Sequence, residues 1–321
     1  MTAPEIPVLS GGGATAATVG NFDGVHVGHR ALIDQLSLSA ARGLKSLLVT
    51  FDRHPAALLR PEAAPPLLTT PAEKKELLAA TGLDYLAVMR FDAAFAALSP
   101  RAFVVDVLLE RLRVRHIVVG RDHGFGRGRS GDVDSLRRFG SQSGFTVGVA
   151  QDVEIAGQRV SSSAAREALL RGDVGHAATI LGRPYSLTGE VVRGQGRGRK
   201  IGFPTANLAE TGRGKLIPLA GVYAAHAEIL SGARGPGGRW PALVHLGPKP
   251  VFGEKDETIE AWLLDFDGDL YGCDLRVEFV ARLRGIEDFR GVEELKEAVR
   301  SDKARARAIF AGSGRGLETR G

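Results

Sequence analysis

The chain has 321 residues, of which 44% are hydrophobic, enough for two domains of ordinary size with a core each. Its single cysteine, Cys273, excludes a disulfide within the chain and suits a reducing compartment. The net charge of +5 suits phosphate-bearing partners, but only 6% of the residues are aromatic and none stands among the basic clusters, which disfavours nucleic-acid binding.

At the start of the chain, residues 1–13 have neither the basic beginning nor the long apolar run of a signal peptide. No later run approaches the ~20 apolar residues that a membrane helix needs. We therefore expect a cytoplasmic protein that does not bind membranes.

Strand-like and helical patterns then alternate as far as residue 172. Strands are predicted at 15–20, 46–51, 84–91, 116–120 and 145–150. Helices are predicted at 26–42, 71–82, 99–112, 132–144 and 162–172. This alternation predicts an α/β domain of the Rossmann-like type, in which helices cover both faces of a mostly parallel sheet. Ligands of such sheets bind at the carboxyl ends of the strands.

Beyond residue 181 the pattern becomes all-β. Strand-like runs separated by Gly, Pro and Asp lie at 185–194, 221–230, 240–247, 258–266 and 273–283, and one helical pattern follows at 292–310. We expect a small closed β-barrel with a terminal helix. The change of pattern predicts two domains, residues 1–182 and 183–321.

Residues 20–29 read GNFDGVHVGH, between the first predicted strand and the first helix. The stretch has neither the lysine of a P-loop nor the G-x-G-x-x-G of a dinucleotide site. His26 and His29 stand three residues apart at the start of the helix and so share one face. Helix N-termini attract anions, and imidazoles there suit the charge that builds on a phosphate during transfer. The alternative is a pair of structural or capping histidines.

The longer string G-x-F-D-G-x-H-x-G-H resembles the adenylyltransferase half of bacterial bifunctional riboflavin kinase/FAD synthetases, and blocks at 50–59, 100–132 and 160–169 are similar to that family in the same order. The resemblance implies that His26 and His29 hold ATP phosphates and stabilise the transition state. It also implies further residues around ATP and FMN. The phosphate-binding residues would be Gly20, Asn21, Gly24, Gly28, Ser162, Ser163 and Arg166, and the flavin pocket would include Asp122 and Phe125.

Three readings in this half stay open. His123 stands where the family usually has an aromatic residue, which leaves the packing of its loop in question. The serines at 161–163 also fit a helix N-cap, which does not exclude phosphate binding. Asp122 also fits an acid that forms a turn in a glycine-rich loop.

The second half contains a glycine-rich turn, RGQGRGRK at 193–200, followed by GFPTAN. Alone, the turn fits a flexible loop as well as a phosphate cradle. The PTAN string resembles that of riboflavin kinases, which implies that Thr205 and Asn207 hold Mg²⁺ and ATP phosphates. The cradle would then consist of Gly194, Gly196, Gly198 and Lys200.

A carboxylate is the candidate base for the riboflavin hydroxyl. Glu260 alternates with Trp262 and Leu264, so it lies on an otherwise apolar strand face, where an acid is either paired or functional. We interpret it as the general base. Three acids at 265, 267 and 269 have a metal-like spacing, but a hairpin turn accounts for them better.

The resemblance extends from about Thr15 to Phe310 and implies one chain that phosphorylates riboflavin to FMN and adenylylates FMN to FAD. Its substrates would be riboflavin, FMN and ATP, with Mg²⁺ as the cofactor. His245, Lys249 and Val251 depart from the family pattern beside the kinase site. The alternative is therefore an FAD synthetase whose weakened kinase barrel serves as a flavin-binding sensor.

Overall fold

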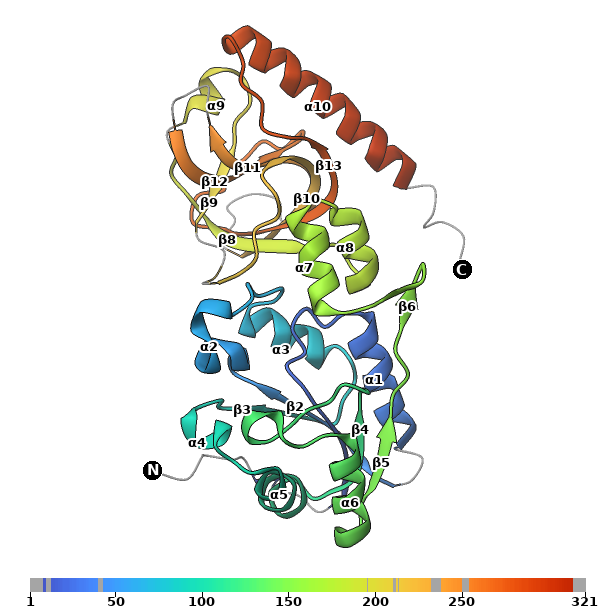
Figure 1. The fold of residues 1–321 in the computed structure, drawn as a ribbon. Coiled ribbons are helices and arrows are strands. Elements are labelled where there is room, and N and C mark those ends of the chain that lie inside the picture. The colour runs from blue at the N-terminus through green and yellow to red at the C-terminus, as the bar shows by residue number, and fades with distance from the viewer. Residues whose placement is uncertain are drawn as a thin grey trace. The chain divides into compact units, whose positions relative to one another are not determined.

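A computed structural model describes residues 8–9, 13–39, 43–194, 196–209, 212, 214–231, 238–249 and 254–313. The chain divides into two compact units, residues 1–162 and 163–321, drawn in Figure 1. Each unit is described by itself.

The first unit contains a five-stranded parallel sheet. Its strands are β1 (Thr15–Val19), β2 (Lys45–Phe51), β3 (Tyr85–Met89), β4 (Val114–Val119) and β5 (Thr146–Val149), in the order β3-β2-β1-β4-β5. The predicted α/β architecture is confirmed. All five residues of the central strand β1 are buried, as expected of a strand that has a neighbour on each side and helices over its faces.

The helices of this unit begin where the sequence provides N-caps. They are α1 (Val27–Ser39), α2 (Pro55–Leu59), α3 (Pro71–Ala79), α4 (Ala93–Ala96), α5 (Pro100–Ala102) and α6 (Val133–Ser143), with short 3₁₀ turns η2 (Pro61–Ala63) and η4 (Arg127–Arg129). At α3, Thr70 and Glu73 form a reciprocal capping box and Pro71 is the first helical residue. A small hairpin, β6 (Glu154–Ile155) and β7 (Gln158–Arg159), closes the unit.

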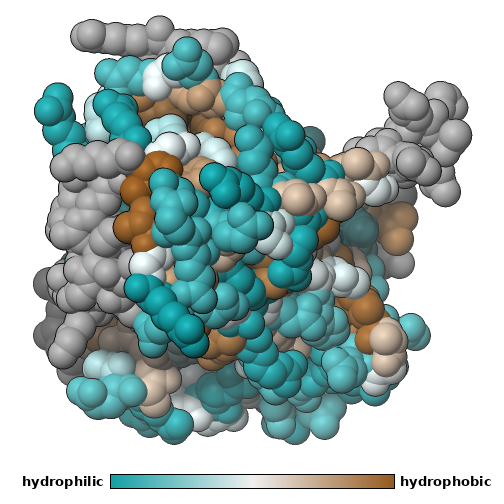
Figure 2. Space-filling model, turned by 90° about the horizontal axis from the view of Figure 1, so that it is seen from above, coloured by the Kyte–Doolittle hydropathy of each residue, from teal (hydrophilic) through white to brown (hydrophobic). Residues whose placement is uncertain are grey.

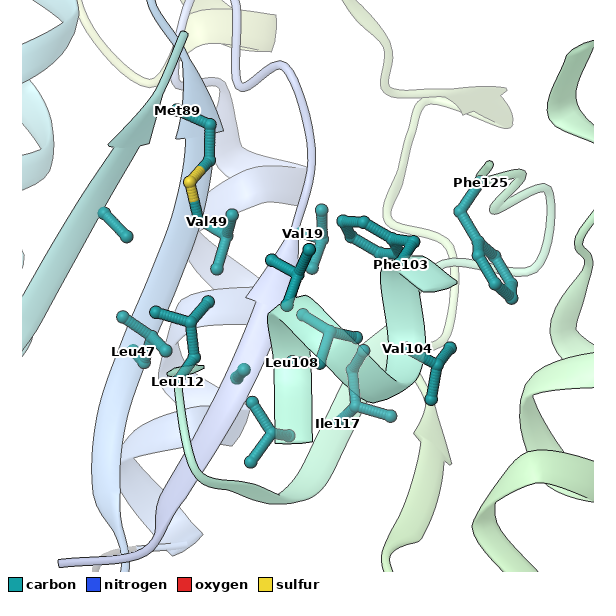
Figure 3. Packing of buried hydrophobic residues seen from close by; sticks show 14 of the residues in the cluster. Val19, Leu47, Val49, Met89, Phe103, Val104, Leu108, Leu112, Ile117 and Phe125 are labelled. Atoms are coloured by element: carbon teal, nitrogen blue, oxygen red, sulfur yellow. The ribbon is translucent and has the colours of Figure 1, made fainter. Parts of the chain in front are cut away.

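One predicted helix has an unexpected form. The pattern at 99–112 does begin at a Ser99 cap, but after α5 the chain continues as a π-helix, η3 (Phe103–Arg111). The N–H of Leu112 donates to the carbonyl of Val107, five residues back. Figure 3 shows the apolar face of this segment, Phe103 and Leu108 included, turned toward the strand that carries Val19.

The second unit contains a closed antiparallel barrel of six strands. They are β8 (Ser186–Val192), β9 (Ala206–Leu208), β10 (Gly221–Ser231), β11 (Gly238–Lys249), β12 (Glu254–Leu263) and β13 (Asp274–Arg284), in the order β10-β11-β12-β9-β8-β13. The barrel prediction is confirmed, and β9 is an addition to the five predicted strands. Its three residues pair with β12 on one side and β8 on the other, and so close the barrel.

Side chains of the barrel strands face two different environments. On one face, Tyr223 and Phe279 are fully buried with ring centroids 5.2 Å apart. On the other, residues such as Leu243 and Trp262 pack against α10 (Val292–Ser313), the predicted terminal helix. The contact between barrel and helix is reinforced by a buried ion pair between Arg284 Nε of β13 and Asp302 Oδ2 of α10, 2.9 Å apart.

Helices α7 (Ser162–Leu170) and α8 (Val174–Leu181) precede the barrel, and the short α9 (Arg197–Lys200) follows β8. The division between the compact units falls at the first residue of α7. The N–H of Leu219 in the barrel unit donates to the carbonyl of Leu169, 3.0 Å away. Both helices are therefore grouped with the barrel, whereas the sequence pattern placed the boundary after residue 182, which stays a prediction.

The surface shows no broad apolar face in the view of Figure 2, where hydrophilic residues separate small hydrophobic patches. Within the described residues, every helix is too short or too polar to cross a membrane.

Candidate active sites

The first site lies where the order of the parallel strands reverses. β1 and β4 are neighbours, but the chain continues from β1 to β2 on one side and from β4 to β5 on the other. In open α/β sheets, ligands bind at this point, beyond the carboxyl ends of the strands. The loops that leave there are residues 20–26 after β1 and 120–132 after β4, the two segments that the sequence selected.

The loop after β1 has an unusual backbone conformation. Phe22 and Val25 have positive φ angles of 52° and 41°, which side chains other than glycine rarely adopt. A buried carboxylate holds this shape. Asp23 accepts hydrogen bonds from the N–H groups of Leu68 and Thr69 and from the Thr69 hydroxyl, all at 3.0–3.1 Å. The aspartate of the motif therefore shapes the loop, a function that the sequence did not reveal.

His26 and His29 lie face to face. Their ring centroids are 3.5 Å apart and the rings are 13° from parallel. The backbone N–H of His29 donates to His26 Nδ1 at 3.2 Å, directly before α1 begins. His26 therefore caps the helix, and its Nδ1 is unprotonated, which puts the proton of the neutral ring on Nε2. Capping of α1 by His26 does not exclude binding of a phosphate by the same pair of histidines.

His29 lies in a setting that keeps it neutral. Burial lowers its pKa well below the ordinary 6.5, and unfavourable electrostatic interactions with His26 and with the Lys74 ammonium add to that effect. Among the described residues, its Nδ1 atom is buried without a hydrogen-bond partner. A neutral imidazole has one donor and one acceptor nitrogen, and the described residues leave the hydrogen-bonding capacity of Nδ1 unused.

The remaining loop residues bring backbone close to these rings. A Cβ added at Gly28 would lie 3.2 Å from His26 Nδ1, so glycine lets the helix start pass beside the imidazole. The carbonyl of Asn21 accepts hydrogen bonds from the Thr50 hydroxyl at 3.1 Å and from Lys74 Nζ at 3.2 Å. Lys74 had no signal in the sequence, because it looks like one more charged position of a surface helix.

The loop after β4 contains the predicted flavin residues. Asp122 is exposed and forms an ion pair with Arg159 of β7, which also pairs with Asp152 at 3.1 Å. Phe125 lies in the core cluster of the sheet and is only 6% exposed, with its ring 5.9 Å from that of Phe103. The structure thus puts Phe125 beneath the loop, and its contact with flavin stays a prediction.

His123 settles the question left by its departure from the family pattern. Its ring stacks on Phe125 with the centroids 5.8 Å apart and 21° from parallel. Burial, with a smaller contribution from Arg129, lowers its pKa from 6.5 to about 4. The imidazole is therefore neutral at physiological pH and fills the aromatic position as a flat ring.

The serine block lies at the start of α7. The hydroxyl of Ser162 donates to the carbonyl of Asp23 at 2.9 Å, which ties the helix start to the histidine loop. Ser163 and Arg166 follow on the same helix and belong to the second compact unit. Their contact with a triphosphate stays a prediction.

The second site is built on β9 and β12. The hydroxyl of Thr205, directly before β9, donates to Glu260 Oε2 at 3.2 Å. Asn207 of β9 stands opposite Glu260 in the ladder, so their side chains lie on the same face. Glu260 is 8% exposed. The structure therefore brings together the three residues to which the kinase chemistry was assigned.

The glycine-rich turn packs directly against these residues. A Cβ at Gly194 would clash with the Asn207 amide, and one at Gly198 would clash with the carbonyl oxygen of Phe203 and lie 3.3 Å from Thr205 Oγ1. Gly196 has a φ of 64°. Lys200 ends α9, and its side chain lies outside the described residues. Glycine is required in this turn because the backbone touches the Thr and Asn side chains.

A pocket of about 740 Å³ opens beside the turn. Gly194, Asn207 and Thr258 line it, as do the exposed apolar side chains of Leu170 and Leu219. Leu170 is contributed by α7, which the sequence assigned to the other domain.

Two further groups of residues remain from the sequence: those that depart from the family pattern, and the three acids at 265, 267 and 269. His245 of β11 stands opposite Glu260, whereas the Lys249 side chain and Val251 lie outside the described residues. Asp265 pairs with Arg307 at 2.7 Å, and Asp269 accepts the N–H of Tyr271 at 3.0 Å, as expected of a turn. No group of three or more His, Cys, Asp or Glu side chains suited to a metal occurs among the described residues.

Two family models match different parts of the chain. The family model for FAD synthetase matches residues 12–164, and the model for riboflavin kinase matches residues 181–310. A crystal structure described as a macrolide-efflux protein from Streptococcus pneumoniae superposes with a TM-score of 0.82 at 28% identity, covering 93% of this chain and 95% of the other.

Curated relatives match along most of their length. The bifunctional riboflavin kinase/FMN adenylyltransferase of Escherichia coli K12 is 38% identical over 91% of this chain and 92% of its own. That of Pseudomonas fluorescens is 40% identical over 92% and 93%, and that of Bacillus subtilis 35% over 91% of each. The chain belongs to the family of bifunctional riboflavin kinase/FMN adenylyltransferases.

Proposed function

We propose that the two compact units divide the protein's two activities between them. The barrel phosphorylates riboflavin to FMN, and the α/β unit adenylylates FMN to FAD, with ATP as the donor in both reactions. One observation carries the assignment of the barrel: Thr205, Asn207 and Glu260 come together on neighbouring strands beside a glycine turn. Because both reactions consume ATP, we place the protein in the cytoplasm.

In the α/β unit, an FMN phosphate oxygen attacks the α-phosphorus of ATP, and the bond to pyrophosphate breaks. The nucleophile is already an anion, so no protein base is required, and catalysis consists of positioning and charge stabilisation. His26 and His29 stand side by side at the start of α1, where the helix dipole also favours a phosphate. We assign them to hydrogen-bonding the triphosphate, with Gly20, Asn21, Gly24 and Gly28 shaping the loop below them. Ser162, Ser163 and Arg166 are assigned to the phosphates as well.

In the barrel, the riboflavin 5′-hydroxyl attacks the γ-phosphorus of ATP, and ADP leaves. An alcohol is a poor nucleophile, so its proton must be accepted as the bond to phosphorus forms. Glu260 is the carboxylate beside Thr205 and Asn207, and we assign it as that base. The hydrogen bond from the Thr205 hydroxyl occupies Oε2 and orients the carboxylate.

The residues present also fit a Mg²⁺ ion. Thr205 and Asn207 offer a hydroxyl and an amide oxygen, hard ligands that suit magnesium, and substrate phosphates supply further oxygens in kinase sites. Gly194 lies so close to the Asn207 amide that a Cβ there would clash with it, so the glycine turn runs directly beside this proposed ligand. An ion held there would offset negative charge on the ATP phosphates. We assign Thr205 and Asn207 to holding it.

Incubation of the purified protein with riboflavin, ATP and Mg²⁺, followed by chromatography, tests the proposal. We expect FMN to appear first and FAD to follow, and both to require ATP. Supplied FMN should give FAD without riboflavin. If riboflavin binds but yields no FMN with any divalent metal, the barrel is the flavin sensor of the alternative reading, and His245 beside Glu260 is the first residue to revert to the family's Asn.

A further inference from the structure

Lys74 is a buried lysine that the two reactions leave unexplained. It lies on α3 with 8% of its surface exposed, whereas its neighbour Lys75 on the same helix is exposed. Lysine is rarely buried unless its ammonium has partners.

Its partners are backbone carbonyls from two different strand ends. Nζ donates to the carbonyl of Phe51, the last residue of β2, at 2.8 Å and to that of Asn21, in the loop after β1, at 3.2 Å. Neither contact is an ion pair. The ammonium therefore ties the end of β2 to the loop that leaves β1.

The same stretch of chain holds the loop at two more points. Asp23 accepts three donors from residues 68 and 69, and the N–H of Gly24 donates to the Thr69 hydroxyl at 3.1 Å. Positive φ angles at Phe22 and Val25 persist only where surrounding contacts impose them. Lys74 also reaches Phe51 at the end of the neighbouring strand β2, whose Thr50 hydroxyl is a second donor to the Asn21 carbonyl at 3.1 Å.

From these contacts we infer that Lys74 is a positioning residue for adenylyl transfer: it fixes the carbonyl of Asn21 and thereby the loop that presents His26 and His29 to the phosphates. The inference rests on the proposed function of the α/β site. A geometric error of about 1 Å at reacting groups can lower a rate by about 10²-fold, so a support for this loop acts on the rate.

Electrostatics agrees with the geometry. Phe22 and His26 lie against the His29 ring, and the Lys74 charge helps to lower the histidine pKa. Around Lys74 itself, burial lowers its pKa, while the carboxylates of Asp23 and Asp52 oppose that shift. Replacing Lys74 by an uncharged residue should therefore raise the pKa of His29.

The test compares Lys74→Met, which keeps the apolar stem but has no donor, with Lys74→Arg and with Lys75→Met as the matched control. FAD formation from FMN is measured per folded molecule across pH, and FMN formation by the barrel of the same chain reports integrity. We expect Lys74→Met to lower kcat for FAD about 10–100-fold. The pH at which the rate responds to His29 ionisation should move upward, and FMN formation should hold.

Lys74→Arg should keep the position of that ionisation and recover part of kcat, and Lys75→Met should match the parent. A folded Lys74→Met protein with the parent's kcat and pH profile would overturn the inference. If Lys74→Met does not fold, Lys74→Arg decides the question. A Lys74→Arg protein that forms FAD with the full parental kcat although its pH profile is displaced would contradict a positioning function. A parent that makes no FAD at all would instead refute the function proposed for the α/β site.

Discussion

The two ATP sites of this protein are built in opposite ways. In the α/β unit, a loop with positive φ angles is held from beneath by buried polar side chains, namely Asp23, Thr69 and Lys74. In the barrel, a glycine turn lies directly on Thr205 and Asn207, and the absence of side chains allows the contact. The difference matches the chemistry that we propose for the two sites: FMN would attack as an anion and need only placement, whereas the riboflavin hydroxyl would need a base, the function we assign to Glu260.

The largest effect should come from removing that base. Glu260→Gln keeps the size and hydrogen bonding of the side chain, but FMN formation should fall by roughly 10²–10⁴-fold because no proton acceptor remains. Riboflavin affinity should change little, since proton transfer acts mainly in the transition state. FAD formation from supplied FMN should continue at the parent rate. Glu228→Gln, on the barrel surface, is the matched control.

Turnover, riboflavin affinity and melting temperature should be measured on one preparation. A stable Glu260→Gln protein with undiminished FMN production would remove Glu260 from the mechanism. A protein that loses stability while kcat per folded molecule holds would make Glu260 a structural partner of its neighbours.

The reciprocal change in the α/β unit is His29→Ala. It should lower FAD formation by ~10²–10³-fold, the usual cost of losing one preorganised donor to a developing charge. FMN formation should be spared, because we assign that reaction to the barrel. His176→Ala on α8 serves as the control. Parent-rate FAD synthesis by His29→Ala would show that the histidine pair does not serve the phosphates.

A third experiment locates the boundary between the α/β unit and the barrel unit. Residues 183–321 contain the whole barrel, but the fragment 163–321 adds α7 and α8, with the Leu169–Leu219 hydrogen bond and the pocket wall at Leu170. We expect both fragments to phosphorylate riboflavin, with the longer one melting ~2–8 °C higher, as 1–2 kcal/mol would give at this size. Equal melting temperatures would place the boundary after α8.

The smallest effect concerns His123 and should appear only in acid. Its native pKa of about 4 is lower than the unfolded 6.5, so the unfolded chain binds more protons between these values. Stability from this group is therefore complete above pH 6.5 and decreases as pH falls toward 4, by about 2 kcal/mol at pH 5. His123→Phe should keep the stacking and remove this loss. Denaturant unfolding of the α/β unit at pH 7 and pH 5 measures it, and equal losses in parent and variant would contradict the assignment.

Whether a feature could be predicted from the sequence depended on the kind of signal that the feature leaves there. Periodic elements such as β1 and α10 were predictable, since their patterns repeat over several residues. β9 was not, because three residues are too few to show a period, although its PTAN string had already marked its chemistry. The donors to Asp23 and the position of Lys74 depend on contacts between residues 45 to 53 positions apart, which no local pattern records. In the sequence, His123 departed from the aromatic residue that the family usually has. The structure shows that the buried, neutral imidazole fills that position as a flat ring.

The strand β9 gives the barrel an unusual dependence between folding and activity. Its ladder has two registered pairs with β12 and two with β8, so little holds it in place compared with the long strands on either side. Short ladders open locally at low free energy while the rest of a domain stays folded. Each such opening would withdraw Asn207 from Glu260 and interrupt the barrel wall at once. If Asn207 and Glu260 act as we propose, competence for phosphoryl transfer depends on this short strand, and hydrogen exchange at Asn207 should follow the inactive fraction of otherwise folded molecules.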